Sequence, residues 1–134
     1  MTGSAPVEEA PEGSYLASRF HDPHRSRDVW RVYYEDGRVE AFDGEEWWTV
    51  CTFTPEQVAG AKEAVRRSGL LAASDVRLDG AYDVASVSYA WRLDGETGSV
   101  TNWAYPARKH PVFEALDEQL DALEVQAGAD WGRL

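Results

Sequence analysis

The chain has one cysteine, two lysines and no long hydrophobic run, and these shortages exclude several classes of protein. Cys51 cannot form an internal disulfide, which indicates a reducing compartment. No apolar stretch approaches the ~20 residues of a membrane-spanning helix. The first thirteen residues lack the basic and apolar regions of a signal peptide. We therefore expect a cytoplasmic protein with no membrane partner, and the arginine-rich, alanine-rich composition is typical of a GC-rich bacterial genome.

Recognisable catalytic and cofactor motifs are also missing. Glycines occur singly, mostly in Asp-Gly turns, so no glycine-rich phosphate loop is present. Cys51 lies in an apolar run without a nucleophile motif, which predicts a buried, inert thiol. His21 and His24 are separated by Pro23 in a polar segment, and Cys51, His110 or a carboxylate would have to complete a metal site. We predict no catalytic residue, metal or cofactor, and favour a protein that is not an enzyme.

The charge is strongly negative, with 24 acidic and 13 basic residues and a formal net charge of −11. Repulsion of this size disfavours nucleic acid as a partner and favours fast association with a basic protein. Acidic residues gather at 35–46 and along the expected last helix, where no lysine or arginine occurs from 111 to 125. The helix carries Glu114, Asp117, Glu118 and Asp121.

Two basic clusters interrupt this negative charge. They consist of Arg19, Arg25, Arg27 and Arg31, and of Arg108, Lys109 and His110. The second cluster directly precedes a predicted helix, whose dipole disfavours cations at that end. A bound anion would relieve this repulsion, and free amides at the helix start would also bind it. Arg108, Lys109 and His110 are therefore a candidate anion site, unless they extend into water or pair with the acids of the helix.

Alternating apolar and polar residues predict an antiparallel sheet. The expected strands are 14–20, 29–35, 38–42, 45–53, 82–93 and 99–105, of which we expect four or five to form the sheet. Asp-Gly pairs at 36–37 and 43–44, and the segment 94–98, predict the turns. In 29–35, one face carries Trp30 and Val32, which we expect to be buried, and the opposite face carries Tyr33.

Two amphipathic helices complete the predicted fold. Thr54, Pro55 and Gln57 form a capping box with proline at the first position, and Gly69 ends the helix. A second helix begins at Pro111, with an apolar stripe of Val112, Phe113, Leu116, Leu120 and Leu123. Both helices are one-sided and should cover one sheet face, which gives an α+β fold. We expect an acidic disordered tail over 1–13, one domain over 14–125 and a short tail over 126–134.

The uncovered sheet face is predicted to expose aromatic side chains, namely Tyr33, Tyr82, Trp103 and Tyr105. A cleft lined by Tyr82, Tyr89, Trp91, Trp103 and Tyr105 would suit a small ligand, and a second copy of the chain could instead cover this face. Trp47 and Trp48 are neighbours in a strand, so one ring should be buried and the other exposed as an interface anchor. The alternative is that both rings are buried.

Our leading hypothesis is a non-enzymatic protein-binding module, such as an inhibitor or immunity-type protein with a basic partner. Its candidate surface comprises Glu114, Asp117, Glu118, Asp121, Trp47 and Trp48. The alternative is a small-molecule binding protein, or a small enzyme, that uses the aromatic cleft. The order of the YEDGRV strand, the TPEQV helix, a hairpin and a closing helix is similar to that of small intracellular inhibitors of metallopeptidases. No functional residue matches, so we assign no family.

Overall fold

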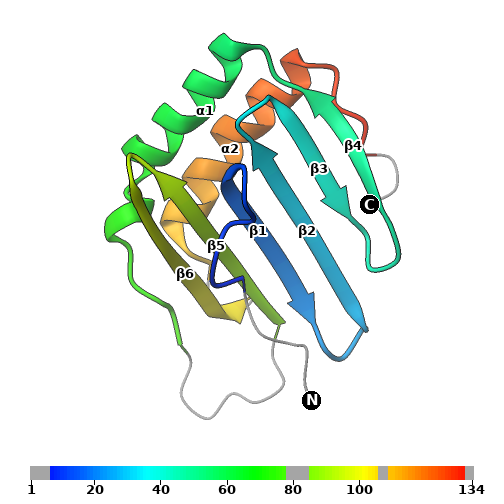
Figure 1. Cartoon of the computed structure of the whole chain (residues 1–134). Coiled ribbons are helices and arrows are strands. Elements are labelled where there is room, and N and C mark those ends of the chain that lie inside the picture. The colour runs from blue at the N-terminus through cyan, green and yellow to red at the C-terminus, as the bar shows by residue number, and fades with distance from the viewer. Residues whose placement is uncertain (1–6, 78–84, 106–108, 132–134) are drawn as a thin grey trace.

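The computed structural model describes residues 7–77, 85–105 and 109–131 and contains a six-stranded antiparallel sheet with two α-helices (Figure 1). Its elements are β1 (Ser14–Asp22), β2 (Arg27–Tyr34), β3 (Arg38–Phe42), β4 (Trp47–Thr52), α1 (Pro55–Ser68), the 3₁₀ helix η1 (Leu70–Ala72), β5 (Ala85–Leu93), β6 (Glu96–Tyr105) and α2 (Pro111–Gln126). The strand order is β4-β3-β2-β1-β5-β6. The α+β class is confirmed, and the predicted four or five strands are corrected to six because each expected segment pairs with a neighbour.

Helix α1 begins and ends where the sequence predicts. Gln57 N donates to Thr54 Oγ1 over 3.2 Å, and Thr54 N donates to Gln57 Oε1 over 2.9 Å, which closes the capping box. Pro55 occupies the first helical position, where a missing N–H costs nothing. Gly69 ends the helix in the left-handed conformation with φ 90°. Local capping chemistry alone therefore fixes both ends of this helix.

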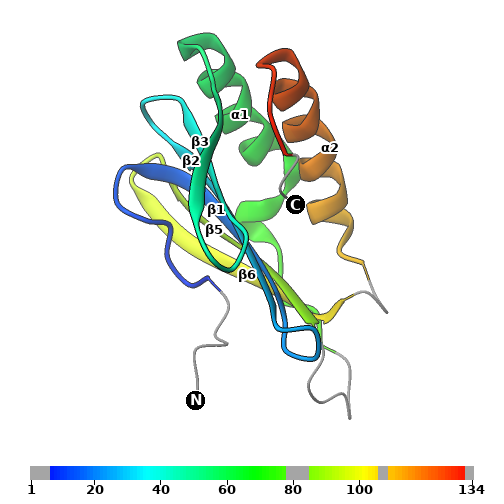
Figure 2. The ribbon, with the colours of Figure 1, turned by 90° about the vertical axis from the view of Figure 1, so that its right-hand side faces the viewer.

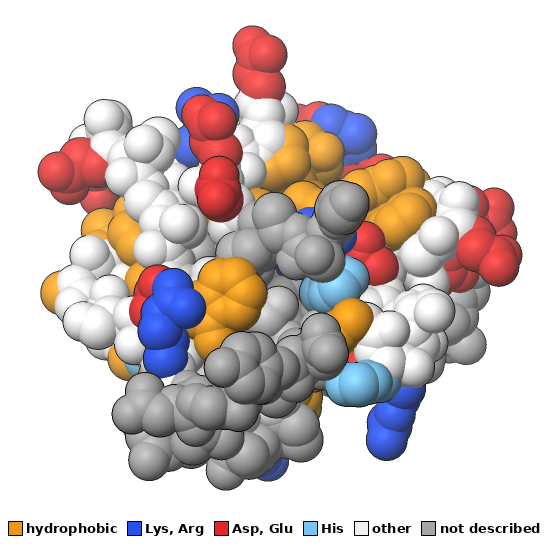
Figure 3. Space-filling model, turned by 90° about the horizontal axis from the view of Figure 1, so that it is seen from below, with side chains coloured by type: hydrophobic (Ala, Val, Ile, Leu, Met, Phe, Trp, Pro, Cys, Tyr) orange, Lys and Arg blue, Asp and Glu red, His pale blue; other side chains and the backbone are white. Residues whose placement is uncertain are grey.

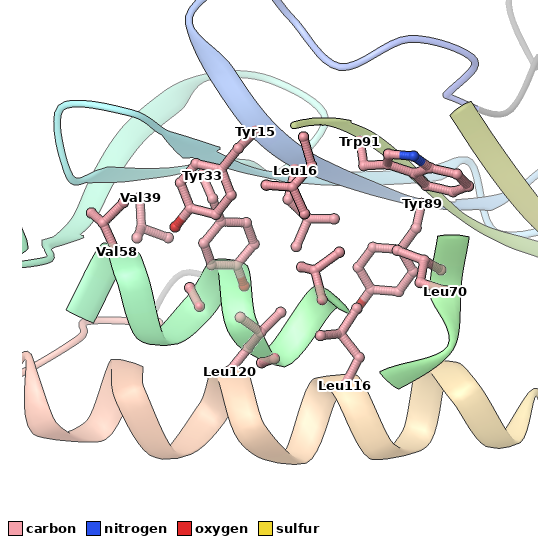
Figure 4. Close-up of a cluster of buried hydrophobic side chains, with 14 of the residues drawn as sticks. Tyr15, Leu16, Tyr33, Val39, Val58, Leu70, Tyr89, Trp91, Leu116 and Leu120 are labelled. Carbon is pink, nitrogen blue, oxygen red and sulfur yellow. The ribbon is translucent and has the colours of Figure 1, made fainter. Parts of the chain in front are cut away.

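Both helices lie on the same face of the sheet, which we call the inner face (Figure 2). The core between the sheet and the two helices is continuous, and aromatic rings from the strands point towards the helices (Figure 4). Its largest fully buried members include Tyr15, Leu16, Tyr33, Leu70, Leu116 and Leu120. Within the described ranges, neither helix is long and apolar enough to cross a membrane.

The two faces of strand β2 are reversed relative to the prediction. Tyr33, predicted to be exposed, is 1% exposed and faces the helices. Trp30, predicted to be buried, is only partly buried and packs with Val32 on the face away from the helices, which we call the outer face. Both faces of this strand carry large apolar side chains, so alternation identifies two faces without showing which one is covered.

The N-terminal segment covers part of the outer face (Figure 2). Val7 and Ala10 are buried against Ala17, Val32 and Ala90. Val7 N donates to Ser88 Oγ over 2.9 Å, and Arg92 Nε donates to the carbonyl of Ala10 over 2.8 Å. The expectation of a tail over 1–13 thus differs from the structure at residues 7–13, because alanines on β1 and β5 leave room for this segment. Residues 1–6 lie outside the described ranges.

The chain also continues to pack after α2. Ala127, Ala129 and Trp131 pack against the inner core, although we expected a tail from residue 126. Asp130 N donates to the carbonyl of Val50 over 3.0 Å, which ties this segment to the edge strand β4. The C-terminal segment therefore closes the space between α2 and β4.

Candidate functional site: a cavity between the sheet and α2

A cavity of about 420 Å³ lies between the inner sheet face and the first half of α2. The strand ends and the helix start that surround it lie in the lower half of Figure 1, and Figure 3 views this end of the molecule. Histidine, acidic and hydrophobic side chains lie close together on this surface. The apolar part of the cavity lining consists of Phe20, Val29, Val87, Tyr105 and Phe113.

Two rows of side chains across three strands form the sheet side of this cavity. Phe20 of β1 pairs with Val29 of β2 and with Val87 of β5, which gives an apolar row. Two residues earlier on β1, Ser18 pairs with Arg31 on one side and with Tyr89 on the other. Ser18 is small and lies on the central strand between two long side chains. We attribute the hollow to this difference in size.

His110 begins the helical wall as the N-cap of α2. Its Nδ1 accepts a hydrogen bond from Val112 N over 3.3 Å, so Nε2 carries the proton and donates to the carbonyl of Ser74 over 3.0 Å. The ring stacks on Phe113 with centroids 4.5 Å apart. Because Pro111 has no N–H and Val112 N is capped, the helix start offers fewer free amides than the anion hypothesis assumed. His110 therefore acts as a cap in this arrangement, not as an anion donor.

The acidic residues of α2 fall into two groups. Asp117 lines the cavity and accepts a hydrogen bond from the Tyr89 hydroxyl. Burial raises the pKa of the Asp117 carboxyl, and burial together with the Asp117 charge raises the pKa of Tyr89. Glu114, Glu118 and Asp121 are exposed, although Glu114 also borders the cavity. Asp117 is therefore partly buried in the cavity lining and is not part of an exposed acidic surface.

The cavity brings together members of both basic clusters, Arg27, Arg31 and Lys109. The Arg31 guanidinium lies 4.4 Å from the Trp131 ring centroid and 3.9 Å from Asp121 Oδ1. Lys109 Nζ is 3.9 Å from Glu114 Oε1, and both side chains are mostly exposed. Exposed pairs at this distance contribute little to stability. Arg108, which the sequence groups with Lys109 and His110, lies outside the described ranges.

The remaining arginines of the first cluster lie elsewhere. Arg19 donates to both carboxylate oxygens of Asp28, over 2.7 and 2.9 Å, and its guanidinium covers the Trp30 ring on the outer face. Its charge therefore does not face the cavity, although the residue borders it. Arg25 lies in the exposed β1–β2 turn, 3.8 Å from Asp22 Oδ2.

A second buried carboxyl lies further along α2. Glu124 is 1% exposed, accepts a hydrogen bond from the Tyr33 hydroxyl over 2.8 Å, and its Oε1 has no hydrogen-bond partner. Burial raises the pKa of Glu124 to about 7. The sequence held one signal for its position, since Leu116, Leu120 and Glu124 are spaced by four residues and share a helix face. By charge alone, Glu124 is not distinguished from the exposed acids of this helix.

The predicted aromatic cleft is not assembled on the outer face. Tyr89 and Trp91 are buried in the inner core, and Tyr105 contacts Phe20 edge-on beside the cavity, with centroids 5.7 Å apart. Trp103 is half-buried, and the Arg77 guanidinium lies 5.1 Å from its ring centroid. The fifth member of the set, Tyr82, lies outside the described ranges.

The outer face instead carries an aromatic strip of Trp30, Phe42 and Trp47, which are paired across β2, β3 and β4. Trp47 is 48% exposed and stacks on Phe42 with centroids 5.1 Å apart. Its neighbour Trp48 packs against the inner core, and its indole Nε1 donates to the carbonyl of Asp130 over 3.2 Å. The two tryptophans thus lie on opposite faces, as strand alternation requires.

The residues considered for metal binding lie on different elements of the fold. His21 is near the end of β1, His24 lies in the following turn, Cys51 is buried in β4 and His110 caps α2. Over 7–77, 85–105 and 109–131, no three histidine, cysteine or carboxylate side chains are grouped as metal ligands would be. Comparison with models of protein families and with curated proteins finds no match for this chain.

Proposed function

We propose that this protein binds a small molecule in the cavity between the inner sheet face and α2. The supporting observation is a hollow of about 420 Å³, lined by aromatic and aliphatic side chains with a few charged groups. Small-molecule sites have this composition and a volume of roughly 300–1,000 Å³. The sequence analysis placed a small-molecule site on the outer sheet face, whereas this proposal places it on the inner face.

Several walls of the cavity are held in place without a ligand. Tyr89 is fixed by its hydrogen bond to Asp117, and both nitrogens of His110 are engaged. Phe113 stacks on His110 and meets Tyr89 edge-on, with ring centroids 4.5 and 4.9 Å from its own. A site whose side chains are already ordered loses little conformational entropy when a ligand binds.

We place binding ahead of catalysis because two titratable side chains of the lining, Asp117 and His110, are already engaged in hydrogen bonds. Asp117 accepts from Tyr89, and His110 bonds Val112 N and the carbonyl of Ser74. A general base must reach the proton it abstracts within hydrogen-bond distance. Asp117 and His110 would have to give up these contacts before they could do so.

The Ser18→Leu variant tests the proposal because it fills the hollow from the central strand. We would screen a library of small metabolites by thermal shift against this variant and the wild type. Ser99→Leu is the matched control, since Ser99 is exposed on β6. Compounds that stabilise the wild type and Ser99→Leu but not a folded Ser18→Leu support the proposal. If every stabilising compound acts equally on all three proteins, the cavity is not the site.

A second candidate function is protein binding through the outward side of α2. Glu114, Glu118 and Asp121 are exposed there, next to Val125 at 79% exposure. An acidic surface with an apolar residue at its edge suits a basic partner. Trp47, the exposed tryptophan of the predicted surface, lies on the outer sheet face and would not share this interface.

Affinity capture from cell extract at low and moderate salt would test this second function. The variant is Glu118→Lys with Asp121→Lys, and the control carries the same charge change at Glu45 and Glu96, which are exposed on other elements. A stoichiometric protein retained by the control but lost by the variant supports it. Equal retention by both variants excludes this face.

The predicted homodimer would use the aromatic strip on the outer face. Sedimentation at rising concentration tests it, with Trp47→Ser as the variant. A dimer that persists unchanged in Trp47→Ser would rule out the strip as its interface.

A further inference from the structure

We infer that the ligand of this cavity is a small organic acid, with an aromatic or branched apolar body and one carboxylate. This inference rests on the proposed function and names the class of ligand. It follows from how charge and apolar surface are distributed around the cavity.

The charge balance of the cavity is opposite to that of the whole chain. The chain has 13 basic and 24 acidic residues. Besides Arg19, the cavity lining contains the cationic residues Arg27, Arg31 and Lys109, against two acids, Glu114 and Asp117. Arg19 is left out of this count because its guanidinium binds Asp28 on the other side of the sheet. A locally positive hollow in a protein of net charge −11 attracts anions against the overall field.

The cations in the cavity retain capacity for a ligand. Arg27 is exposed and makes no ion pair with any described residue. Arg31 and Lys109 approach carboxylates only at 3.9 Å, beyond hydrogen-bond distance. A guanidinium offers five N–H donors in a planar fork that matches a carboxylate. Arg27 and Arg31 lie two strand positions from Val29 on the same face, so a carboxylate can reach either of them.

The acids of the cavity limit the charge that a ligand can carry. Glu114 and Asp117 both line it, so a second negative charge on the ligand would be repelled. A carboxylate therefore fits better than a phosphate dianion.

The remaining surface calls for an apolar body. Phe20 and Tyr105 meet edge-on at one end, and Phe113 lies at the helix start. Together with the Val29 and Val87 side chains they provide the apolar contact that a ring or branched chain would bury. The carboxylate would then point towards Arg27 and Arg31.

Four probes of similar size isolate the charge of the ligand. They are phenylacetate, 2-phenylethanol, 2-phenylethylamine and phenyl phosphate. We would measure their dissociation constants by titration in ¹H–¹⁵N NMR spectra at pH 8 and low salt. We expect phenylacetate to bind about tenfold more tightly than the alcohol, and the amine to bind most weakly. Phenyl phosphate, a dianion at this pH, should bind more weakly than phenylacetate.

Two arginines of one hairpin provide a matched pair of variants. Arg27→Glu should weaken phenylacetate binding about tenfold or more, and the milder Arg27→Gln should weaken it less. Arg25→Glu makes the same charge change at a residue that does not line the cavity, and should leave the dissociation constant unchanged. Both positions are exposed, so these variants should fold.

The outcomes separate this inference from the proposed function. If the alcohol or the amine binds as tightly as phenylacetate and Ser18→Leu abolishes that binding, the cavity is a ligand site but the carboxylate inference is wrong. If phenyl phosphate binds more tightly, the preference for a single charge is wrong. If phenylacetate binds equally to wild type, Arg27→Glu and Ser18→Leu, the carboxylate inference is wrong and the cavity is not the binding site. No binding of phenylacetate overturns the inference, whereas metabolite hits lost in Ser18→Leu would still support the proposed function.

Discussion

The Tyr33 hydroxyl donates a 2.8 Å hydrogen bond to Oε2 of Glu124, which joins β2 to α2 inside the protein. Tyr33 and Glu124 are each 1% exposed, and the other carboxylate oxygen has no hydrogen-bond partner. A buried carboxylate with one unpaired oxygen is costly when charged. Burial in this interior therefore raises the pKa of the Glu124 carboxyl.

The stability of the protein should consequently depend on the titration of Glu124. Burial raises its pKa from 4.5 to about 7, so the folded state binds more protons than the unfolded state between these values. The free energy of unfolding should fall as pH rises from about 4.5 to about 7, by up to about 3 kcal/mol from this residue. Burial also raises the pKa of Asp117, which adds a change of the same sign.

Glu124→Gln removes this titration. Urea unfolding at pH 5 and pH 8 should show a smaller loss of stability for the variant than for the wild type, by about 2–3 kcal/mol. Glu118→Gln, an exposed position on the same helix, is the control and should follow the wild type. Parallel pH profiles for Glu124→Gln and the wild type would show that the carboxyl is charged in the folded protein.

Two glycines should respond to alanine with opposite signs. Gly98 pairs with Trp91, and a Cβ at Gly98 would collide with the indole ring, so Gly98→Ala should destabilise by about 1–3 kcal/mol. Gly60 lies inside α1, where an added Cβ would meet Leu123 Cδ2 at an ordinary 3.7 Å. Gly60→Ala should therefore stabilise by about 0.5–1 kcal/mol. Chemical denaturation measures both changes, and equal signs would contradict this packing.

The contact of residues 7–13 with the outer face can be tested at Val7. Val7→Asp places a charge against Ala17 and Ala90, so the segment should detach at a cost of about 2–3 kcal/mol. Limited proteolysis should then cut within residues 7–13 much faster than in the wild type. Glu8→Ala, at an exposed neighbour, should leave the cleavage rate unchanged. Rapid cleavage of the wild-type segment would restore the expectation of a tail.

The thiol of Cys51 should be unreactive while the protein is folded. Burial raises the pKa of this thiol to about 11, and the thiolate is the reactive form. Titration with Ellman's reagent at pH 8 should give no fast reaction without denaturant and one thiol per chain in guanidinium chloride. Fast labelling of the folded protein would show that β4 opens readily at this edge of the sheet.

Local signals in the sequence predicted the elements of this fold well. The capping box of Thr54 and Gln57 located α1, and the Asp36-Gly37 pair located the β2–β3 turn, where Gly37 has φ 100°. Such signals depend on residues within a few positions of each other. The choice of which face of β2 is covered does not depend on such local signals. Trp30 and Tyr33 are both large aromatics, and tertiary packing decides which of them is buried.

The cavity could not have been predicted from the chain because it depends on strand register. Ser18, Arg31 and Tyr89 are distant in sequence and meet only because β1 pairs with both β2 and β5. The two basic clusters were visible as runs of charge, but the separation of Arg19 from Arg31 onto opposite faces required the pairing. Side-chain size on a central strand is likewise meaningful only when its neighbours are known.

Mapping of ¹H–¹⁵N shift changes during a phenylacetate titration tests the central claim most directly, because it compares the three candidate surfaces in one experiment. We predict that the largest saturating changes fall on Ser18, Phe20, Arg31, Tyr89 and Phe113, and that Ser18→Leu removes them. Changes centred on Trp30, Phe42 and Trp47, or on the outward side of α2 around Glu118, would contradict the assignment of the cavity as the ligand site.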